Sequence, residues 1–208
     1  MSVQEAVDFI RKHKRFLVSS HTNMEGDALG SQLGIYFLIK KLKKHAVMVN
    51  DEGVPYGYEF LPALGKIRHF KEGLKDLKFD CFVTVDCSDL KRTGEVYLLN
   101  AENKPVLNID HHISNSNFGE ANWVDPKASS ASEMVYRLYK NMGVALDKDA
   151  ALALYAGILT DTGSFRFNNT SSATHMVTAD LLTYGIDVPG VYKNIYGSIS
   201  YSELNLLT

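Results

Sequence analysis

"VLNIDHHISN" (106–115) joins a short apolar run to three adjacent polar groups, Asp110, His111 and His112. The segment 106–110, "VLNID", has the length of a buried strand and ends at Asp110. Three more runs of this kind, each ending in polar residues, predict further strands at 15–20, 46–51 and 81–86. The sequence therefore predicts several buried strands that deliver polar side chains at their ends.

Segments with helical periodicity separate or follow these strands. They predict helices at 3–13, 28–43, 131–142, 148–160, 172–184 and 188–197, with a short helix also compatible with the turn-rich stretch 52–65. The apolar segment before Asp161 is compatible with helix or strand. The alternation predicts an α/β fold, a predominantly parallel sheet with helices on both faces, followed by a mainly helical C-terminal part.

The composition narrows the class of protein. A chain of 208 residues, 45% of them hydrophobic, is long enough for one sizeable domain. The net charge of −2 shows no basic excess, which argues against binding long duplex nucleic acid. Cys81 and Cys87 are predicted to be free thiols, and no segment reads as a signal peptide or a membrane span. We therefore expect a cytoplasmic protein without a membrane partner.

The ionisable residues gather where strands are predicted to end. In parallel α/β sheets, functional groups lie beyond the carboxyl ends of the strands. Four stretches supply them: His21, Glu25 and Asp27 after the first strand, Asp86 after a second, Asp110, His111 and His112 after a third, and Asp161 in "GILTDTGSF". The sequence thus predicts that these side chains share one edge.

Any one of these aspartates could simply form a turn or cap the next helix. Taken together, however, several carboxylates at one edge would repel each other unless a positive charge neutralised them. Two divalent ions balance the four charges of Glu25, Asp27, Asp86 and Asp161. Mixed imidazole and carboxylate ligands favour Mn²⁺ or a similar ion over calcium. Two metal ions held roughly 3.5–4 Å apart are a common arrangement in enzymes that hydrolyse phosphoesters.

Four motifs in order resemble the DHH phosphoesterase superfamily. They are "HTNMEGDALGS" (21–31), "VTVDCSD" (83–89), "NIDHHISN" (108–115) and "GILTDTGSFRF" (157–167). Further along, "WVDPKASSASEMVYRLY" (123–139) resembles the bacterial branch containing nanoRNases, exonucleases of very short oligonucleotides that also act as pAp phosphatases. The resemblance implies hydrolysis of small nucleotides or short single-stranded oligonucleotides by a hydroxide that two metal ions activate.

The same resemblance implies two sets of metal ligands. One ion would be held by His21, Glu25 and Asp86 with Asp161 nearby, and the other by Asp27, Asp86, His111 and Asp161. Asp86 would then bridge the two ions.

Catalytic roles also follow from the resemblance. Asp110 would fix the orientation of an imidazole. His112 would face the substrate phosphate as a donor or proton carrier, although it could instead only support the fold. Ser130, at a predicted helix start, could present amides to a phosphate or serve as an ordinary N-cap. Arg166 could pair with a phosphate or be a surface charge.

The chain departs from the family pattern in two respects. Met24 and Glu25 stand where the family usually has proline and aspartate, which could shift one ion. The sequence resembles the family's N-terminal catalytic domain alone, without the second, substrate-gripping domain. We therefore expect residues 1–190 to form the catalytic domain and 191–208 the terminal helix and start of a linker. The alternatives are a pyrophosphatase or polyphosphatase, or a non-catalytic nucleotide-binding module. A homodimer is compatible with the sequence.

Overall fold

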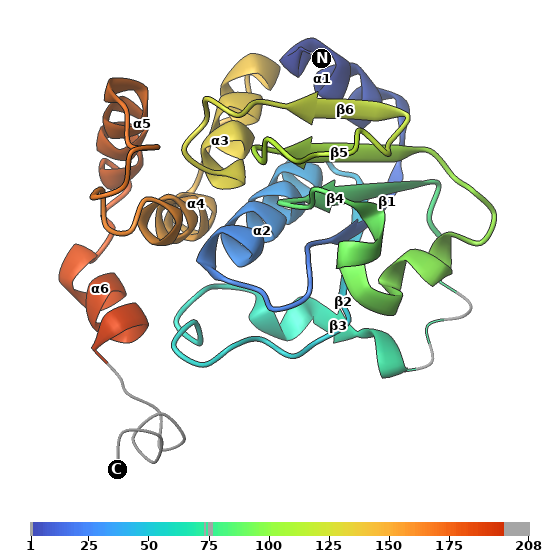
Figure 1. The fold of residues 1–208 in the computed structure, drawn as a ribbon, viewed down its shortest axis with the longest axis horizontal. Helices are drawn as coiled ribbons and strands as arrows, with labels where there is room; N and C mark the ends of the chain where they lie inside the picture. Colours follow the sequence, from blue (N-terminus) through green and yellow to red (C-terminus); the bar gives the residue numbers. More distant parts are fainter. Residues whose placement is uncertain (1, 73, 75–76, 198–208) are drawn as a thin grey trace.

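A parallel sheet of six strands forms the centre of the computed structural model, which describes residues 2–72, 74 and 77–197 (Figure 1). The strand order is β3-β2-β1-β4-β5-β6, and every neighbouring pair is parallel. The strands are β1 (Arg15–Ser19), β2 (His45–Asn50), β3 (Ile67–His69), β4 (Cys81–Val85), β5 (Val106–Asp110) and β6 (Ala121–Val124). The four predicted strands are confirmed, and the short β3 and β6 extend the sheet at its two edges.

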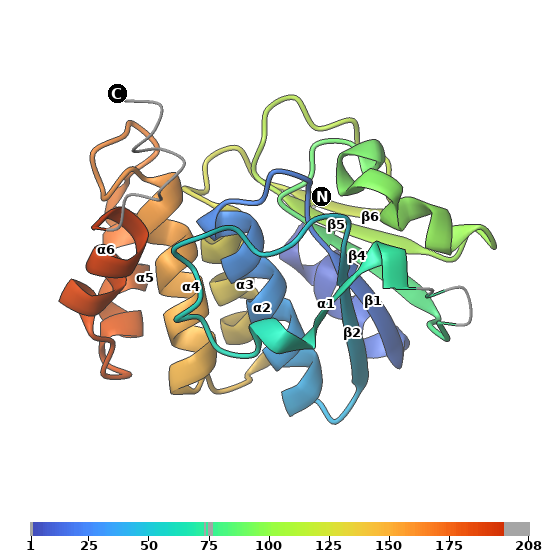
Figure 2. The same cartoon turned by 90° about the horizontal axis from the view of Figure 1, so that it is seen from below.

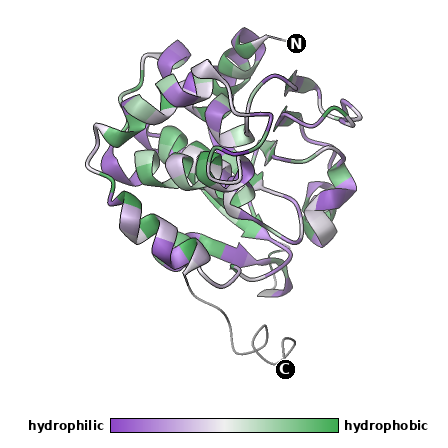
Figure 3. Ribbon diagram, turned by 60° about the vertical axis from the view of Figure 1, so that its left-hand side comes forward, coloured by the Kyte–Doolittle hydropathy of each residue, from purple (hydrophilic) through white to green (hydrophobic). Residues whose placement is uncertain are grey.

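The strand side chains alternate between two buried cores. Leu17, Phe82 and Val106 belong to one apolar cluster, whereas their neighbours Phe16 and Val83 belong to the other. Because both faces are covered, the central strands β4 and β5 are buried along their whole length, and most of their residues are apolar. Figure 3 shows the apolar residues, in green, along the strands and the helices that pack against them.

The two faces have different covers. Three α-helices contact the sheet on one face, namely α1 (Val3–Lys12), α2 (Gly26–Lys41) and α3 (Ala131–Met142). On the other face lies the 3₁₀ segment η4 (Leu90–Asn100), which contacts β2 and β4 (Figure 2). The predicted helices on both faces are therefore present, but on the second face they are short 3₁₀ turns.

The C-terminal part is helical, as predicted, and stacks outward from α2 (Figure 1). It consists of α4 (Lys148–Asp161), α5 (Ser172–Leu182) and α6 (Val188–Tyr196). The helices α2 and α4 approach closely because glycines line their contact. A Cβ on Gly30 would overlap the carbonyl of Ala153, and one on Gly34 would overlap the Leu154 side chain. This packing brings the C-terminus of α4 beside the N-terminus of α2.

Two short 3₁₀ helices flank β3. The turn-rich stretch 52–65 leads into one short helix, η1 (Leu64–Lys66), and η2 (Phe70–Glu72) follows β3. The expected domain boundary after residue 190 falls inside α6, and residues 198–208 lie outside the described part. No helix within the described residues is long and apolar enough to cross a membrane.

Candidate metal centre

The strand order places the predicted residues at one edge of the sheet. Chain connectivity reverses direction between β1 and β4, and their carboxyl ends define the crevice in which such folds bind ligands. His21 follows β1, Asp86 directly follows β4, and Asp110 ends β5. Two helices complete the group, because Asp27 lies in the first turn of α2 and Asp161 is the last residue of α4.

His111 lies at the centre of the cluster. Its Nε2 is 3.5 Å from Asp86 Oδ1, 3.7 Å from Asp161 Oδ2 and 3.9 Å from Asp27 Oδ2. Two groups of potential ligand atoms, each within 4.8 Å of one another, can be drawn among the described residues. They are Asp86, His111 and His112, and Asp27, His111 and Asp161.

Asp86 faces two histidines with its two oxygens. Oδ1 lies near His111, as above, while Oδ2 lies 3.3 Å from His21 Nε2. The Asp86 backbone is left-handed, with φ of 55°, a conformation that is strained for most residues and more tolerable for aspartate. Strain of this kind is found where a side chain must be aimed at a functional site.

His21 is prepared to act as a ligand through Nε2. Its Nδ1 lies 2.6 Å from the carbonyl oxygen of Thr22. Because a carbonyl only accepts hydrogen bonds, Nδ1 carries a proton, and Nε2, 3.3 Å from Asp86 Oδ2, is the nitrogen left to bind a cation. This is the arrangement in which a backbone carbonyl fixes the tautomer of a metal-binding histidine.

The donors fit a divalent cation. Asp86 Oδ1 and His111 Nε2 are both buried, and neither has a hydrogen-bond partner among the described residues. Buried polar atoms without partners are costly, and a cation between them would satisfy both.

The charges point the same way. Burial, together with the charges of Asp86 and Asp161, raises the pKa of Asp27 to about 7. Burial also raises the pKa of Asp161 to about 6, with Asp86 adding to the effect. Burial alone would lower the pKa of His111, but Asp86, Asp27 and Asp161 outweigh it and raise this pKa to about 10. Without a cation the cluster therefore retains protons, which a metal ion would replace.

Asp27 is held by the N-terminus of α3. The amides of Ala131 and Ser132 donate to Asp27 Oδ2 at 2.7 Å and Oδ1 at 2.8 Å. The α3 amides predicted to meet a phosphate thus hold this carboxylate instead. The Ser130 hydroxyl is buried and accepts from the amide of Glu133 at 3.0 Å, as the N-cap alternative requires. A substrate contact by Ser130 stays a prediction.

Asp110 and His112 form a pair. His112 Nδ1 lies 2.7 Å from Asp110 Oδ1, and Asp110 is fully buried. The hydrogen bond that His112 donates to Asp110 raises the pKa of His112 despite partial burial, which favours the imidazolium form. The His112 side chain is 35% exposed, so its ring is accessible to a ligand at the edge of the site.

Glu25 stands apart from the tightest ligand groups. It is exposed at the N-cap position of α2, and its side chain makes no cap hydrogen bond. Neither potential ligand group in the described residues includes Glu25 or His21. Its charge nevertheless helps to raise the pKa of Asp161, which places Glu25 near the cluster.

Two asparagines that were not predicted support the site. Asn169 Nδ2 donates to Ser129 O at 2.9 Å, Asp161 O at 3.0 Å and Asp161 Oδ2 at 3.3 Å. Asn115 Nδ2 lies 2.6 Å from Asp110 Oδ2. Asn115 belongs to the "NIDHHISN" motif, which predicted a role for Asp110, whereas "NNTSS" around Asn169 is typical of an ordinary loop. Arg166 is exposed, and its Nε donates to Gly163 O at 2.7 Å.

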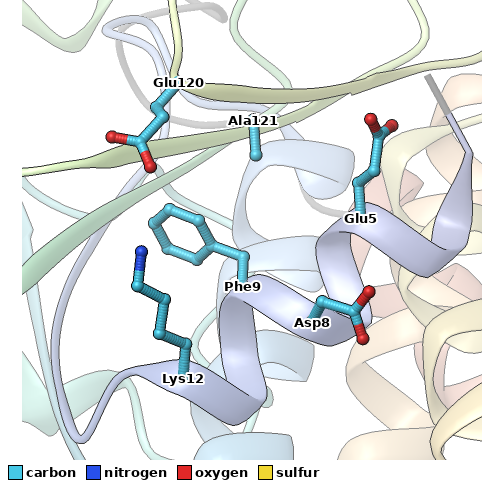
Figure 4. Close-up of a pocket in the computed structure, with 6 residues that line it drawn as sticks. All are labelled: Glu5, Asp8, Phe9, Lys12, Glu120 and Ala121. Atoms are coloured by element: carbon cyan, nitrogen blue, oxygen red, sulfur yellow. The ribbon is translucent and has the colours of Figure 1, made fainter.

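A hollow between α1 and β6 shares no lining residue with the candidate metal centre. Figure 4 shows it lined by Phe9 and Ala121, with the charged side chains of Glu5, Asp8, Lys12 and Glu120 around them. These charged residues are exposed, and the lining contains no histidine. The hollow therefore lacks the buried donors that distinguish the edge of the sheet.

The fold and this edge define an α/β protein with grouped aspartate and histidine side chains that could bind metal ions. The DHH family, N-terminal domain, matches residues 15–158, so the chain belongs to the DHH family. The predicted membership is thereby confirmed.

Two bacterial proteins have sequences similar to most of this chain. The chain is 36% identical over 170 residues to the "Bifunctional oligoribonuclease and PAP phosphatase NrnA" of Thermus thermophilus, covering 81% of this chain and 50% of that protein. It is 31% identical to a "Probable bifunctional oligoribonuclease and PAP phosphatase NrnA" of Streptococcus mutans, covering 89% and 58%. The chain thus spans about half the length of these relatives.

A solved structure shows the same fold. An exopolyphosphatase-related protein from Bacteroides fragilis superposes with a TM-score of 0.90 at 27% identity. The match covers 99% of this chain and 63% of that one.

Proposed function

We propose that this DHH-family protein is a metal-dependent phosphoesterase acting on small nucleotides: short oligoribonucleotides, pAp or linear dinucleotides. The activities in the names of the curated relatives support the substrate class. The observation that carries the proposal is the placement of the Asp86 oxygens, one toward His21 and one toward His111. A carboxylate in this position can join two cations.

The proposed metal ligands are those expected from the motifs. His21, Glu25 and Asp86 would hold one ion, with Asp161 nearby. The second would be held by Asp27, Asp86, His111 and Asp161. Imidazole nitrogens mixed with carboxylate oxygens suit Mn²⁺. When bound, the two ions would lower the pKa of a water molecule and offset the phosphate charge. Glu25 needs to turn inward to contribute, because its side chain is exposed.

His112 would act on the substrate through Nε2. Its Nδ1 is engaged by Asp110, and the hydrogen bond to Asp110 raises the pKa of the ring, which favours the protonated form. The imidazolium can therefore donate from Nε2 to a phosphate oxygen or to the leaving oxygen. Asp110, buried and also hydrogen-bonded by Asn115, would hold the ring in orientation. Arg166 would pair with a further phosphate oxygen.

The proposal extends to the setting of this domain. Residues 1–190 would form the catalytic unit, with 191–208 leading toward a second, substrate-gripping domain. We expect processing of oligonucleotides to be weaker in this chain alone than in one that carries both parts. A cytoplasmic location, small nucleotide partners and a homodimer stay predictions of the same kind.

The second candidate function is hydrolysis of inorganic pyrophosphate or polyphosphate. The structural likeness to an exopolyphosphatase-related protein favours it. A nucleotide-binding module without turnover is the third candidate, since Glu25 replaces the family's aspartate.

The deciding assay supplies Mn²⁺ and measures release of mononucleotide from a dinucleotide, phosphate from pAp and phosphate from pyrophosphate. We expect turnover on the first two. Turnover on pyrophosphate alone would favour the second candidate, and nucleotide binding with no turnover on any would favour the third.

Asp86→Asn is the sharpest variant, because asparagine also tolerates the left-handed backbone. We expect the rate to fall by more than about 100-fold, the upper range for losing even an outer metal contact. Asp149→Asn, an exposed aspartate in the first turn of α4, is the matched control. A normal rate in Asp86→Asn would refute the bridging role.

A further inference from the structure

The loop that joins α4 to α5 has both of its ends at the metal centre. It begins after Asp161 and leads to Asn169, whose side chain donates back to the carbonyl and carboxylate of Asp161. Asn169 also donates to Ser129 O, next to the N-terminus of α3. Both ends of the loop 162–168 therefore lie beside the candidate site.

This loop has an uncommon backbone. Gly163, Ser164 and Phe165 are all left-handed, with φ of 55°, 60° and 65°. For residues with a side chain this conformation is unfavourable, so the surroundings must hold it. The amide of Ser164 donates to Leu159 O at 2.8 Å, and the Phe165 ring lies 5.4 Å from the ring of His175. The backbone turns sharply here, before Arg166 and Phe167.

Arg166 and Phe167 are exposed, and both are anchored to Gly163. The Phe167 ring lies directly against the Cα of Gly163, since a Cβ there would overlap the ring. Arg166 Nε donates to the carbonyl of the same glycine at 2.7 Å. Phe167 is nevertheless 56% exposed. The Phe167 ring is thus fixed in place and exposes apolar surface to solvent, next in sequence to Arg166.

We propose that Phe167 stacks on the nucleobase of the substrate while Arg166 pairs with its phosphate. An aromatic face binds any base, because every base has a π-face, and a guanidinium pairs with phosphate oxygens. Base and phosphate are adjacent in one nucleotide, as these two side chains are in the loop. The inference rests on the proposed phosphoesterase function and narrows its substrates to phosphate esters that carry a base.

The kinetic test compares pAp with its abasic analogue, the same sugar bisphosphate without adenine. The measured quantity is the ratio of kcat/KM for pAp to kcat/KM for the analogue. We expect Phe167→Ala to lower this ratio about tenfold and Phe167→Tyr to restore it. Tyr192→Ala is the matched control, since Tyr192 is 53% exposed on α6, and it should keep the wild-type ratio. An unchanged ratio in Phe167→Ala would overturn the proposal.

A binding test separates this inference from the proposed activity. Phe167→Trp places an indole in the loop, while the native Trp123 is buried. Without added metal, AMP should quench the new fluorescence, and ribose 5-phosphate should not. Tyr192→Trp should respond to neither ligand. If the wild type hydrolyses nothing yet AMP quenches Phe167→Trp, the phosphoesterase function fails and the base subsite stands. Equal quenching by AMP and ribose 5-phosphate would reject the subsite.

Discussion

His111 lies among three carboxylates, and their negative charges determine its protonation. Three carboxylates lie within 4 Å of its Nε2, and they raise its pKa to about 10 although burial opposes this. A protonated His111 partly neutralises the cluster, but a metal ligand must be the neutral imidazole. If His111 binds the metal ion as proposed, the proton and the ion compete for the same nitrogen.

This competition predicts proton release on metal binding. At pH 7 His111 is protonated and Asp27, with a pKa of about 7, is half protonated, so Mn²⁺ must displace protons from both. The apparent affinity should rise about tenfold per pH unit between pH 6 and 8 for each proton displaced. Titration calorimetry in buffers of different ionisation enthalpy counts the protons. His111→Asn is the control, and its pH dependence should be shallower. A pH-independent affinity would contradict the prediction.

The predictability of the site differed from residue to residue. Asp86, Asp110 and His111 could be placed from sequence because a strand end fixes their position with no knowledge of packing. The partners of Asp27 could not, since they lie 104 and 105 residues away and depend on how α3 meets α2. The exposed position of Glu25 is likewise a matter of side-chain direction, which a motif does not specify.

At the scale of elements, the long apolar strands were predictable and the short ones were not. The central strands are buried on both faces, and apolar residues predominate in them. The edge strand β3 has only three residues, with Arg68 at its centre, and β6 contains Asn122. These strands form because their neighbours offer hydrogen-bonding partners, a tertiary effect that outweighs weak local preference. η4 escaped prediction because its backbone breaks at Gly94.

The contact between α2 and α4 yields a prediction at Gly157. A Cβ there would overlap Ser132 Oγ and come 2.9 Å from Asp27 Oδ1. Overpacking costs about 1–3 kcal/mol, whereas alanine gains about 1 kcal/mol of helix propensity. We expect Gly157→Ala to destabilise the protein by up to about 2 kcal/mol and to weaken Mn²⁺ binding by displacing Asp27. Denaturant unfolding and metal titration measure the two effects.

The matched control for this substitution is Gly65→Ala. Gly65 lies in η1, and a Cβ there would meet nothing within 4 Å. Such a change is neutral or stabilising by about 0.4–1 kcal/mol, because alanine restricts the unfolded chain. Equal stability of the two variants would show that α2 and α4 can separate at no cost.

For the whole molecule, the raised pKa values of Asp27 and His111 make the free energy of unfolding depend on pH. The folded-state pKa of Asp27 is raised from 3.8 to about 7, and that of His111 from 6.5 to about 10. For each residue, at any pH between its unfolded and its folded pKa, the folded protein binds more protons than the unfolded chain. Stability of the metal-free protein therefore falls as pH rises from about 4 to 7 through Asp27, and from about 6.5 to 10 through His111.

Divalent cations should reverse this loss. At 100 times its dissociation constant, a single bound Mn²⁺ stabilises the folded state by about 2.7 kcal/mol, or roughly 5–11 °C in Tm for a chain of this size. We expect the rise in Tm to be larger at pH 8 than at pH 6, because fewer protons compete at pH 8. Thermal unfolding with Mn²⁺, and with EDTA as the control, measures it. Asp86→Asn should lose most of the shift, since the proposed bridging carboxylate would contact both ions. A full shift in that variant would mean that the metal stabilises the protein elsewhere.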